Sequence, residues 1–237
     1  MLYRDVKRKL IADIASGAVP PGGALANETD LARRFGVSIG TVRRAVDELV
    51  ADHILVRQQG RGTFVGKLDR ERFMFQFFKI VPHEGPREFP EVKLLSLSRS
   101  RATQAEARLL GLAGGASVFR IDNLLSLKGR PLMHDSIVLN ASIFAGLTQA
   151  QFEQREGTIY ELYQTAFGVT VVGAEERVQA VAAPGNSAAL LGLEDSSPAL
   201  RIERIAYTFD QKPAELRVSI VDTREADYVS RLVGHSE

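Results

Sequence analysis

The 237-residue sequence contains no cysteine, which excludes a disulfide framework, a thiolate zinc site and a cysteine nucleophile. Long apolar runs are also missing: no stretch approaches the roughly 18 residues of a membrane span, and the N-terminus, MLYRDVKRKL, is interrupted by charges. We therefore expect a protein that is neither exported nor inserted into a membrane, with the reducing cytoplasm as its compartment. With 45% hydrophobic and 25% charged residues, the chain has a globular composition, and its length fits two small domains.

The signatures of catalysis are scarce as well. The four histidines are scattered without the spacing of metal ligands, and no glycine loop of the phosphate-binding type is present. No nucleophile can be paired with a base from the sequence. We therefore expect no enzyme, no cofactor and no metal site.

Charge is distributed unevenly along the chain, although the net charge is only +1. Residues 1–67 hold 11 lysines and arginines against 7 acidic residues, whereas the remainder holds 19 against 22. A basic N-terminal part followed by a mildly acidic body indicates that the N-terminal part binds nucleic acid.

Three helices are predicted in the N-terminal part. Apolar residues recur at helical spacing over residues 3–16, and Asn27 is a suitable cap for a short helix that ends at Gly36. Ser38 caps a third helix over about residues 39–51. Two short helices joined by a tight glycine turn form a helix-turn-helix.

Two β-prone triplets follow, residues 54–56 and 63–65, around a basic tip that contains glycine. They predict a hairpin wing beside the helix-turn-helix. The third helix fits the major groove of duplex DNA, and the basic tip can reach phosphates or the minor groove. On this pattern alone, the unit could also be a dimerisation or protein-docking domain.

Residues 31–65 read LARRFGVSIGTVRRAVDELVADHILVRQQGRGTFV. Together with the preceding helix, this stretch resembles the winged-helix DNA-binding domain of the GntR family of bacterial transcription regulators. The resemblance places Arg43 on the family's recognition-helix arginine and residues 60–62 on its wing tip. The candidate DNA contacts are Ser38, Gly40, Thr41, Arg43, Arg44, Gln59, Gly60 and Arg61.

The sequence departs from the family at two positions. Thr29 stands in the second helix where many members carry an arginine, and Ile39 stands directly after the cap serine where they carry another. Arg44 and Arg61 can compensate, and Gly40 lets the backbone approach DNA closely. Because each lost arginine–guanine pair removes about 1–3 kcal/mol of discrimination, we expect an altered operator preference.

We divide the chain into a DNA-binding domain over residues 1–66, a charged linker over 67–72 and a second domain over 73–237. The second domain contains an internal repeat. When residues 102–121 are aligned with 183–202, an offset of 81, eight of the twenty positions are identical.

Each half of the second domain reads as strand, short helix, strand, turn and strand. The predicted elements are residues 92–99, 104–110, 117–127 and 132–139 in the first half and 174–182, 187–191, 199–209 and 214–222 in the second. A helix over residues 159–167 joins the halves. Long hairpins and few crossovers predict an α+β domain with an antiparallel sheet and its helices packed on one face.

A leucine-glycine helix end, a strand and the hairpin turn at residues 129–131 carry a second resemblance. Over about residues 70–233 the chain resembles the UTRA ligand-sensing domain of the HutC subfamily, whose fold is similar to chorismate lyase. The resemblance implies a domain that senses an effector and dimerises. A sensing domain joined to a DNA-binding domain gives a one-component switch.

Strand alternation places a few polar residues on an otherwise apolar face of the predicted sheet. The candidate effector contacts are Phe89, Asn123, Asp135, Arg204 and Glu215. The resemblance implies ligand recognition for Asp135 and Glu215. A buried acid costs on the order of several kcal/mol unless it is paired, so Asp135 binds either a ligand or a structural partner. The structural alternative is an ion pair between Asp135 and Arg204 across the repeat axis.

By the resemblance, Asn123 and Leu125 replace arginines that phosphosugar-sensing members place on this strand. We therefore expect a small zwitterion, an amine or a neutral polar effector.

The sequence as a whole predicts a bacterial transcription regulator, with a repressor as the expected kind. It would bind an inverted-repeat operator as a homodimer and change its DNA affinity when the effector binds. A lyase-like enzyme and a purely structural dimerisation domain remain the alternatives for the second domain.

Overall fold

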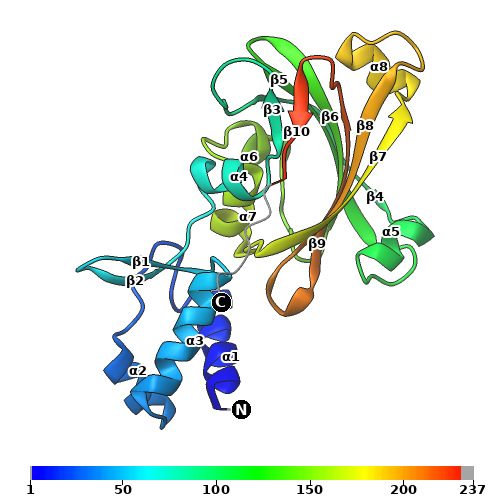
Figure 1. The fold of residues 1–237 in the computed structure, drawn as a ribbon. Coiled ribbons are helices and arrows are strands. Elements are labelled where there is room, and N and C mark those ends of the chain that lie inside the picture. Colours follow the sequence, from blue (N-terminus) through cyan, green and yellow to red (C-terminus); the bar gives the residue numbers. More distant parts are fainter. Residues whose placement is uncertain (1, 231–237) are drawn as a thin grey trace.

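The computed structural model describes residues 2–230, which form a helical N-terminal part and a larger part built on a six-stranded sheet (Figure 1). In chain order the elements are α1 Leu2–Ala15, α2 Glu28–Phe35, α3 Ile39–Ala51, β1 Leu55–Gln58, β2 Gly62–Val65, α4 Arg70–Gln76, β3 Ile80–Pro82, β4 Glu91–Arg101, α5 Gln104–Leu109, β5 Ser117–Leu127, β6 Arg130–Asn140, α6 Gln149–Glu153, α7 Ile159–Phe167, β7 Gly173–Ala182, α8 Gly185–Leu191, β8 Pro198–Tyr207, a 3₁₀ turn Phe209–Gln211, β9 Pro213–Val221 and β10 Ala226–Tyr228. No helix within residues 2–230 is long and apolar enough to cross a membrane.

The three N-terminal helices pack around one apolar core, in which Leu10 of α1 and Leu49 of α3 are fully buried. Asn27 and Ser38 cap α2 and α3, as the sequence predicts. Gly36 ends α2 with a φ of 67°, a left-handed conformation that glycine adopts without strain. This tight turn sets α3 against α2 and completes the helix-turn-helix. The antiparallel hairpin β1–β2 follows as a wing.

The sheet of the larger part has the strand order β4-β5-β6-β9-β8-β7, and every neighbouring pair is antiparallel. The first half of the repeat supplies β4, α5, β5 and β6, and the second half supplies β7, α8, β8 and β9. The two halves meet where β6 pairs with β9 at the middle of the sheet. The repeat in the sequence is therefore an approximate twofold symmetry of the fold, with its axis between these strands.

Helices cover both faces of this sheet, not one face as the sequence predicts. Helices α4, α6 and α7 share the main apolar core with strand residues such as Phe119 and Ile137. The two short helices α5 and α8 pack on the opposite face, α5 over Val118 and α8 over Ile220. We call these the inner face and the outer face, respectively. Val118 and Phe119 are both buried although neighbouring strand residues point to opposite faces, so both faces of this strand are covered.

The segment expected to be a linker, residues 67–72, is largely structured. Leu68 is 0% exposed, and Asp69 caps α4 by accepting a hydrogen bond from the amide of Arg72 at 3.0 Å. The charged segment was taken for a linker, but it contains the start of a helix. An aspartate at the N-cap followed by an acidic residue in the first turn is typical of helix N-termini. The joint between the two parts is thus short and packed.

Candidate DNA-binding surface and effector site

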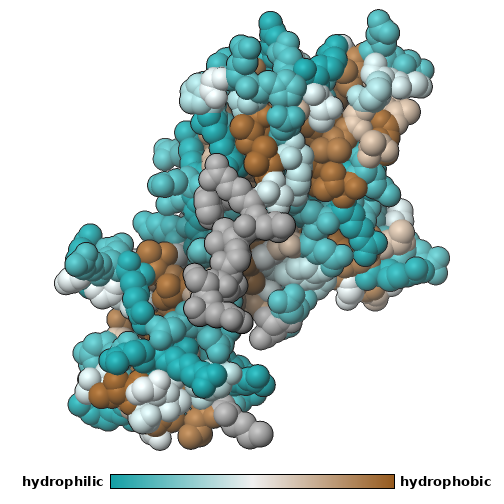
Figure 2. Space-filling view, viewed as in Figure 1, coloured by the Kyte–Doolittle hydropathy of each residue, from teal (hydrophilic) through white to brown (hydrophobic). Residues whose placement is uncertain are grey.

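The N-terminal half of α3 presents a polar surface on the far side of the helical part from the sheet (Figure 1). Ser38, Gly40, Arg43 and Arg44 are exposed, and Thr41 is partly exposed. Ser38 Oγ lies 2.9 Å from Thr41 Oγ1 and also accepts the Thr41 amide at 3.2 Å. Hydrophilic side chains predominate over this part of the molecule in the view of Figure 2.

The arginines of α3 and of the wing are held by acidic side chains. Arg43 donates from Nε to Glu28 Oε2 at 2.9 Å, and its Nη2 lies 2.8 Å from the same oxygen. Arg57 Nη2 of β1 lies 2.5 Å from Asp47 Oδ1 of α3 and 3.8 Å from Glu28 Oε1. Glu28 therefore sits between the arginines of α3 and the wing and fixes the direction of Arg43.

The tip of the wing carries Gln59, Gly60 and Arg61, all exposed. Gly60 and Gly62 have φ values of 71° and 113°, so the turn depends on backbone conformations that favour glycine. The Arg61 guanidinium lies 5.9 Å from the centre of the Phe64 ring. Arg44, on α3, stacks in the same manner over Tyr3 at 4.2 Å.

The inner face of the sheet carries a buried cluster of charged residues at the repeat axis. Asp135 and Glu215 are both 0% exposed, and Arg217 lies between them on β9. Arg217 Nη1 donates to Asp135 Oδ2 at 3.0 Å, and its Nε donates to Glu215 Oε1 at 2.9 Å. Ser219 Oγ donates to Asp135 Oδ1 at 2.5 Å.

Helix α7 contributes two tyrosines to the same cluster. The hydroxyl of Tyr160 donates to Glu215 Oε1 at 3.0 Å, and that of Tyr163 donates to Glu215 Oε2 at 2.8 Å. Burial and the nearby Glu215 carboxylate raise the pKa of both phenols, so both keep their protons and act as donors. Burial works against the charge of Arg217, but Glu215 and Asp135 raise the pKa of its guanidinium well above the ordinary value.

A second buried ion pair lies at the edge of this cluster. Arg204 of β8 donates from Nε to Glu176 Oε1 at 2.7 Å and also donates to the carbonyl oxygen of Phe77. Tyr228 donates to Glu176 Oε2 at 2.5 Å. Burial acts to raise the pKa of Glu176, but Arg204 and Tyr228 outweigh it, and the net shift is downward.

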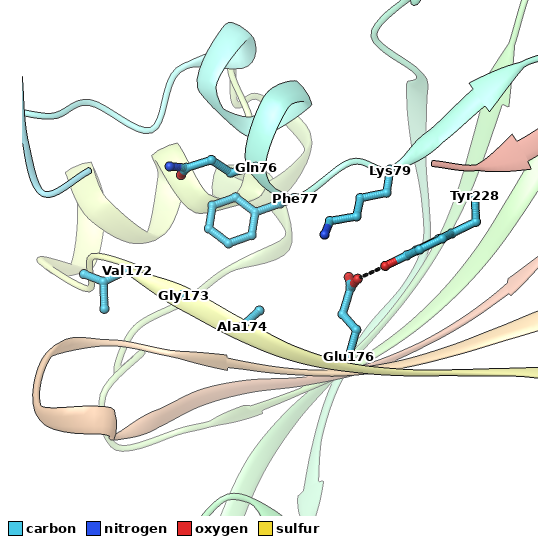
Figure 3. A pocket seen from close by; sticks show the side chains of 8 residues that line it. All are labelled: Gln76, Phe77, Lys79, Val172, Gly173, Ala174, Glu176 and Tyr228. Carbon is cyan, nitrogen blue, oxygen red and sulfur yellow. Dashed lines mark hydrogen bonds between the residues drawn. The ribbon is translucent and has the colours of Figure 1, made fainter. Parts of the chain in front are cut away.

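Two cavities adjoin these residues. The larger cavity, about 350 Å³, is lined by Gln76, Phe77, Lys79, Val172, Gly173, Ala174, Glu176 and Tyr228. Figure 3 shows Lys79, Glu176 and Tyr228 converging on one side of it, with Gln76 and Phe77 on another. The smaller cavity, only about 20 Å³, is lined by residues that include Arg204, Arg217 and Ser219. It has room for about one water molecule, so a larger ligand has to displace side chains that close it.

Two protein families match separate stretches of the chain. Residues 2–65 match the family of bacterial regulatory proteins described as gntR, and residues 87–226 match the UTRA domain. The chain is 28% identical over 218 residues to the histidine utilization repressor of Pseudomonas putida, covering 92% of this chain and 86% of that protein. The chain belongs to the GntR family, in its HutC subfamily.

Two further relatives extend the comparison of this GntR regulator. A fructoselysine utilization operon transcriptional repressor of Escherichia coli K12 is 29% identical over 221 residues, 91% of this chain and 88% of that protein. The solved ligand-binding domain of a GntR-family regulator from Bordetella bronchiseptica superposes with a TM-score of 0.63 at 34% identity. It covers 65% of this chain and 96% of that one. The GntR regulator is therefore a transcription regulator that couples a DNA-binding part to a chorismate lyase-like, ligand-binding UTRA domain.

The structure brings four of the predicted effector residues of the GntR regulator onto one buried face, but not in the pairing that the sequence suggests. Asn123 lies opposite Asp135, and Asp135 lies opposite Ser219 in the sheet. Arg204 is two strands away from Asp135, because β9 lies between β6 and β8. The expected ion pair of Asp135 with Arg204 is thus wrong: Asp135 pairs with Arg217, and Arg204 pairs with Glu176.

The fifth predicted residue, Phe89, lies outside both cavities. Its ring is partly buried against Phe73, with ring centres 6.1 Å apart, and the Arg70 guanidinium lies 5.0 Å above it. Phe89 therefore packs against α4 through Phe73.

Several residues of the cluster in the GntR regulator were not predicted from its sequence. Arg217 was detectable, because strand alternation from Glu215 puts residues 215, 217 and 219 on one face. Tyr160 and Tyr163 share a helix face at a spacing of three, a pattern that also fits an ordinary apolar core. Glu176 and Tyr228 gave no signal, since nothing in their local pattern shows that β7 and β10 meet Arg204.

The outer face holds a separate polar contact that the sequence did not suggest. His134 Nδ1 lies 2.9 Å from Ser187 Oγ of α8, and His134 Nε2 lies 3.7 Å from Asp122 Oδ1. His134 and Ser187 are both buried, so the contact satisfies two polar groups beneath α8. No group of three or more metal-ligating side chains occurs among the described residues.

Proposed function

We propose that this regulator binds an inverted-repeat operator as a homodimer and that a small polar effector, bound at the inner face of the UTRA domain, changes its DNA affinity. The observation that carries this proposal is the charged cluster of Asp135, Glu215 and Arg217, which is buried at the repeat axis and borders the 20 Å³ cavity through Arg217. A purely structural dimerisation domain gains little from such a cluster, because apolar residues of similar volume stabilise a core as well. Because its partner is bacterial DNA, we infer that it works in the cytoplasm.

The DNA-binding surface of this proposal consists of α3 and the wing. It includes Ser38, Gly40, Thr41, Arg43, Arg44, Gln59, Gly60 and Arg61. The outward residues of α3 would enter the major groove, and the wing tip would follow the backbone or the minor groove. We take the DNA-binding domain as residues 1–66 and let the sensing domain begin at Lys67, because Leu68 and α4 pack with the sheet.

The chemistry of the inner face favours an effector that donates hydrogen bonds. Asn123 is 3% exposed, and its Oδ1 has no hydrogen-bond partner within residues 2–230. A buried acceptor without a partner costs about 1–3 kcal/mol, which a ligand ammonium or hydroxyl group would recover. The arginines here are already paired with acids, which disfavours a phosphorylated sugar. A zwitterion, an amine or a neutral polar molecule fits better.

Catalysis in the C-terminal domain is the competing proposal, and the contact of His134 with Ser187 is the observation on its side. We place it second because both side chains are buried, and because the nearest carboxylate oxygen, Asp122 Oδ1, lies 3.7 Å from His134 Nε2, too far to orient the histidine by a hydrogen bond. A cavity of about 400 Å³ on the outer face is lined in part by His134 and Ser187, so the experiment below also tests for turnover.

The experiment that tests the proposal is an electrophoretic mobility shift of the protein on DNA from upstream of its own gene, titrated with candidate metabolites. We expect one class of small polar metabolite to change the affinity, and the metabolite to be recovered unaltered. Turnover of the metabolite would support the enzyme instead. Specific binding that no polar metabolite changes would refute the sensing role.

A further inference from the structure

The joint between the two parts consists of residues 66–69, and its backbone is bound from both sides. The amide of Gly66 donates to the carbonyl oxygen of Ile54 in the DNA-binding part at 2.9 Å. On the other side, the carbonyl oxygen of Gly66 accepts a hydrogen bond from Gln164 Nε2 of α7 at 3.3 Å. A single residue thus bridges the DNA-binding part and the UTRA domain.

Gln164 holds the joint with both ends of its amide. Its Oε1 accepts the amide of Leu68 at 3.2 Å, while its Nε2 donates to Gly66 and to Thr170 Oγ1 at 3.3 Å. Thr158, at the N-terminus of α7, donates from Oγ1 to the carbonyl oxygen of Leu68 at 3.1 Å. Gln164 is only 4% exposed, so water cannot replace these bonds without opening the core.

The same helix reaches the charged cluster through Tyr160 and Tyr163, both bound to Glu215. Residues three and four apart are neighbours on a helix, so Tyr160, Tyr163 and Gln164 move together when α7 moves. The helix spans nine residues, about 13 Å at 1.5 Å per residue, and is too short to bend between them.

We propose that α7 is the element that couples the effector site to the DNA-binding part and that Gln164 is the positioning residue at its output end. A ligand that draws Arg217 or Glu215 away from the tyrosines shifts α7, and Gln164 then shifts the backbone of residues 66–68 where it leaves the wing. This inference rests on the proposed effector site. It adds a named route, made of hydrogen bonds, from that site to the wing.

The test uses the full chain and three variants. Gln164→Met keeps the volume of the side chain and removes its hydrogen bonds, and Tyr163→Phe removes only the bond to Glu215. Thr165→Ala is the matched control, because Thr165 is exposed on the same helix and donates only to the carbonyl oxygen of Glu161. Hydrogen exchange of the Leu68 amide is the readout, since this amide donates to Gln164.

We expect Leu68 exchange to rise about fivefold to tenfold in Gln164→Met and at least twofold in Tyr163→Phe, with no change in Thr165→Ala. The Tyr163→Phe result is decisive, because Tyr163 touches the charged cluster and makes no bond to the joint. Unchanged Leu68 exchange in that variant would overturn the coupling role. If Gln164→Met does not fold, Tyr163→Phe still decides the question.

A second measurement runs in the opposite direction, because coupling between two sites is reciprocal. Saturating the wild-type protein with duplex DNA from upstream of its own gene should change amide exchange within residues 159–167, and Gln164→Met should bind the DNA without that change. An α7 response that persists in Gln164→Met would exclude Gln164 as the link. A protein that binds no DNA would instead refute the proposed function, and Leu68 exchange would still test the coupling.

Discussion

Two exposed arginines of the DNA-binding part differ in how far the protein fixes them. Arg43 is tied to Glu28 by contacts of 2.9 and 2.8 Å, whereas within residues 2–230 the Arg61 guanidinium has a looser contact, with the Phe64 ring 5.9 Å away. A fixed guanidinium can select one base edge, whereas a free one suits a phosphate or a variable groove.

We expect Arg43→Ala to abolish specific binding and Arg61→Ala to weaken binding to all sequences evenly. The loss in Arg43→Ala should amount to about 1–3 kcal/mol of discrimination per half-site. Fluorescence anisotropy on specific and scrambled duplexes measures both effects. Equal loss of specificity in the two variants would contradict these roles.

Ile39 is the first residue of α3 and is 41% exposed. It places an apolar side chain at the end of the recognition helix that meets base edges. We expect it to contact the 5-methyl group of a thymine. Replacing that thymine by uracil should lower the affinity of the wild-type protein about fourfold per half-site, the value of one buried methyl group. Ile39→Ala should bind both DNAs equally, and a variant that still distinguishes them would show that another residue reads the methyl group.

At the scale of single elements, helix α5 depends on one carboxylate. Glu106 accepts the amide of Thr103 at 2.8 Å in a capping box and pairs with Arg120 Nη1 at 2.6 Å. The hydrogen bond from Arg120 leads the causes that lower the pKa of Glu106 to about 2 from its ordinary 4.5, against a smaller upward effect of burial. The carboxylate thus stabilises the folded state when it is ionised.

Because the pKa is lower in the folded state, this stabilisation is complete above about pH 4.5 and is lost as the pH falls toward 2. Glu106→Gln should reduce the free energy of unfolding by on the order of 2–3 kcal/mol at pH 7, and the difference from wild type should shrink below pH 4.5. Urea unfolding at several pH values measures it. The control is Glu175→Gln, which removes an exposed carboxylate and should show no such trend. A pH-independent difference for Glu106→Gln would mean that the charge of Glu106 does not contribute to stability.

The pairing of strands β6 and β9 places Asp135 beside Arg217, and the next prediction concerns this contact. Asp135→Asn keeps the shape of the side chain but weakens the bond to Arg217, so DNA binding should stay intact while the response to the effector found in the mobility-shift screen disappears. Affinity with and without that metabolite provides the measurement. An unfolded variant would favour a purely structural ion pair, and a normal response would remove Asp135 from the site.

Local patterns predicted the long strands, the helix-turn-helix, the wing and the short helices α5 and α8, but missed four other short elements. The caps at Asn27 and Ser38 marked their helices, and alternation put Asn123 and Asp135 on one buried face. By contrast, α4, α6, β3 and β10 are three to seven residues long and exist because they pack on the sheet. The partners of Arg204 and Asp135 followed from the strand order, which local alternation does not contain.

At the scale of the whole molecule, the prediction concerns assembly. One winged helix makes few phosphate contacts, and a twofold dimer doubles them, so we expect a homodimer held by the UTRA domains. A fragment of residues 67–237 keeps Leu68 and α4 with their core and should sediment as a dimer at micromolar concentration. Sedimentation of this fragment as a folded monomer would place the dimer contact elsewhere or exclude it.

The approximate twofold symmetry of the UTRA domain has a consequence for the shape of its ligand. The repeat offset of 81 relates Asn123 to Arg204, and the residues that pair with them, Asp135 and Arg217, occupy equivalent places in the sheet although they are 82 residues apart. One half therefore offers an amide and a carboxylate where the other offers two guanidinium groups. The backbone could accept a molecule in either of two opposite orientations, but these four side chains permit only one, and the site can tell the head of a small molecule from its tail.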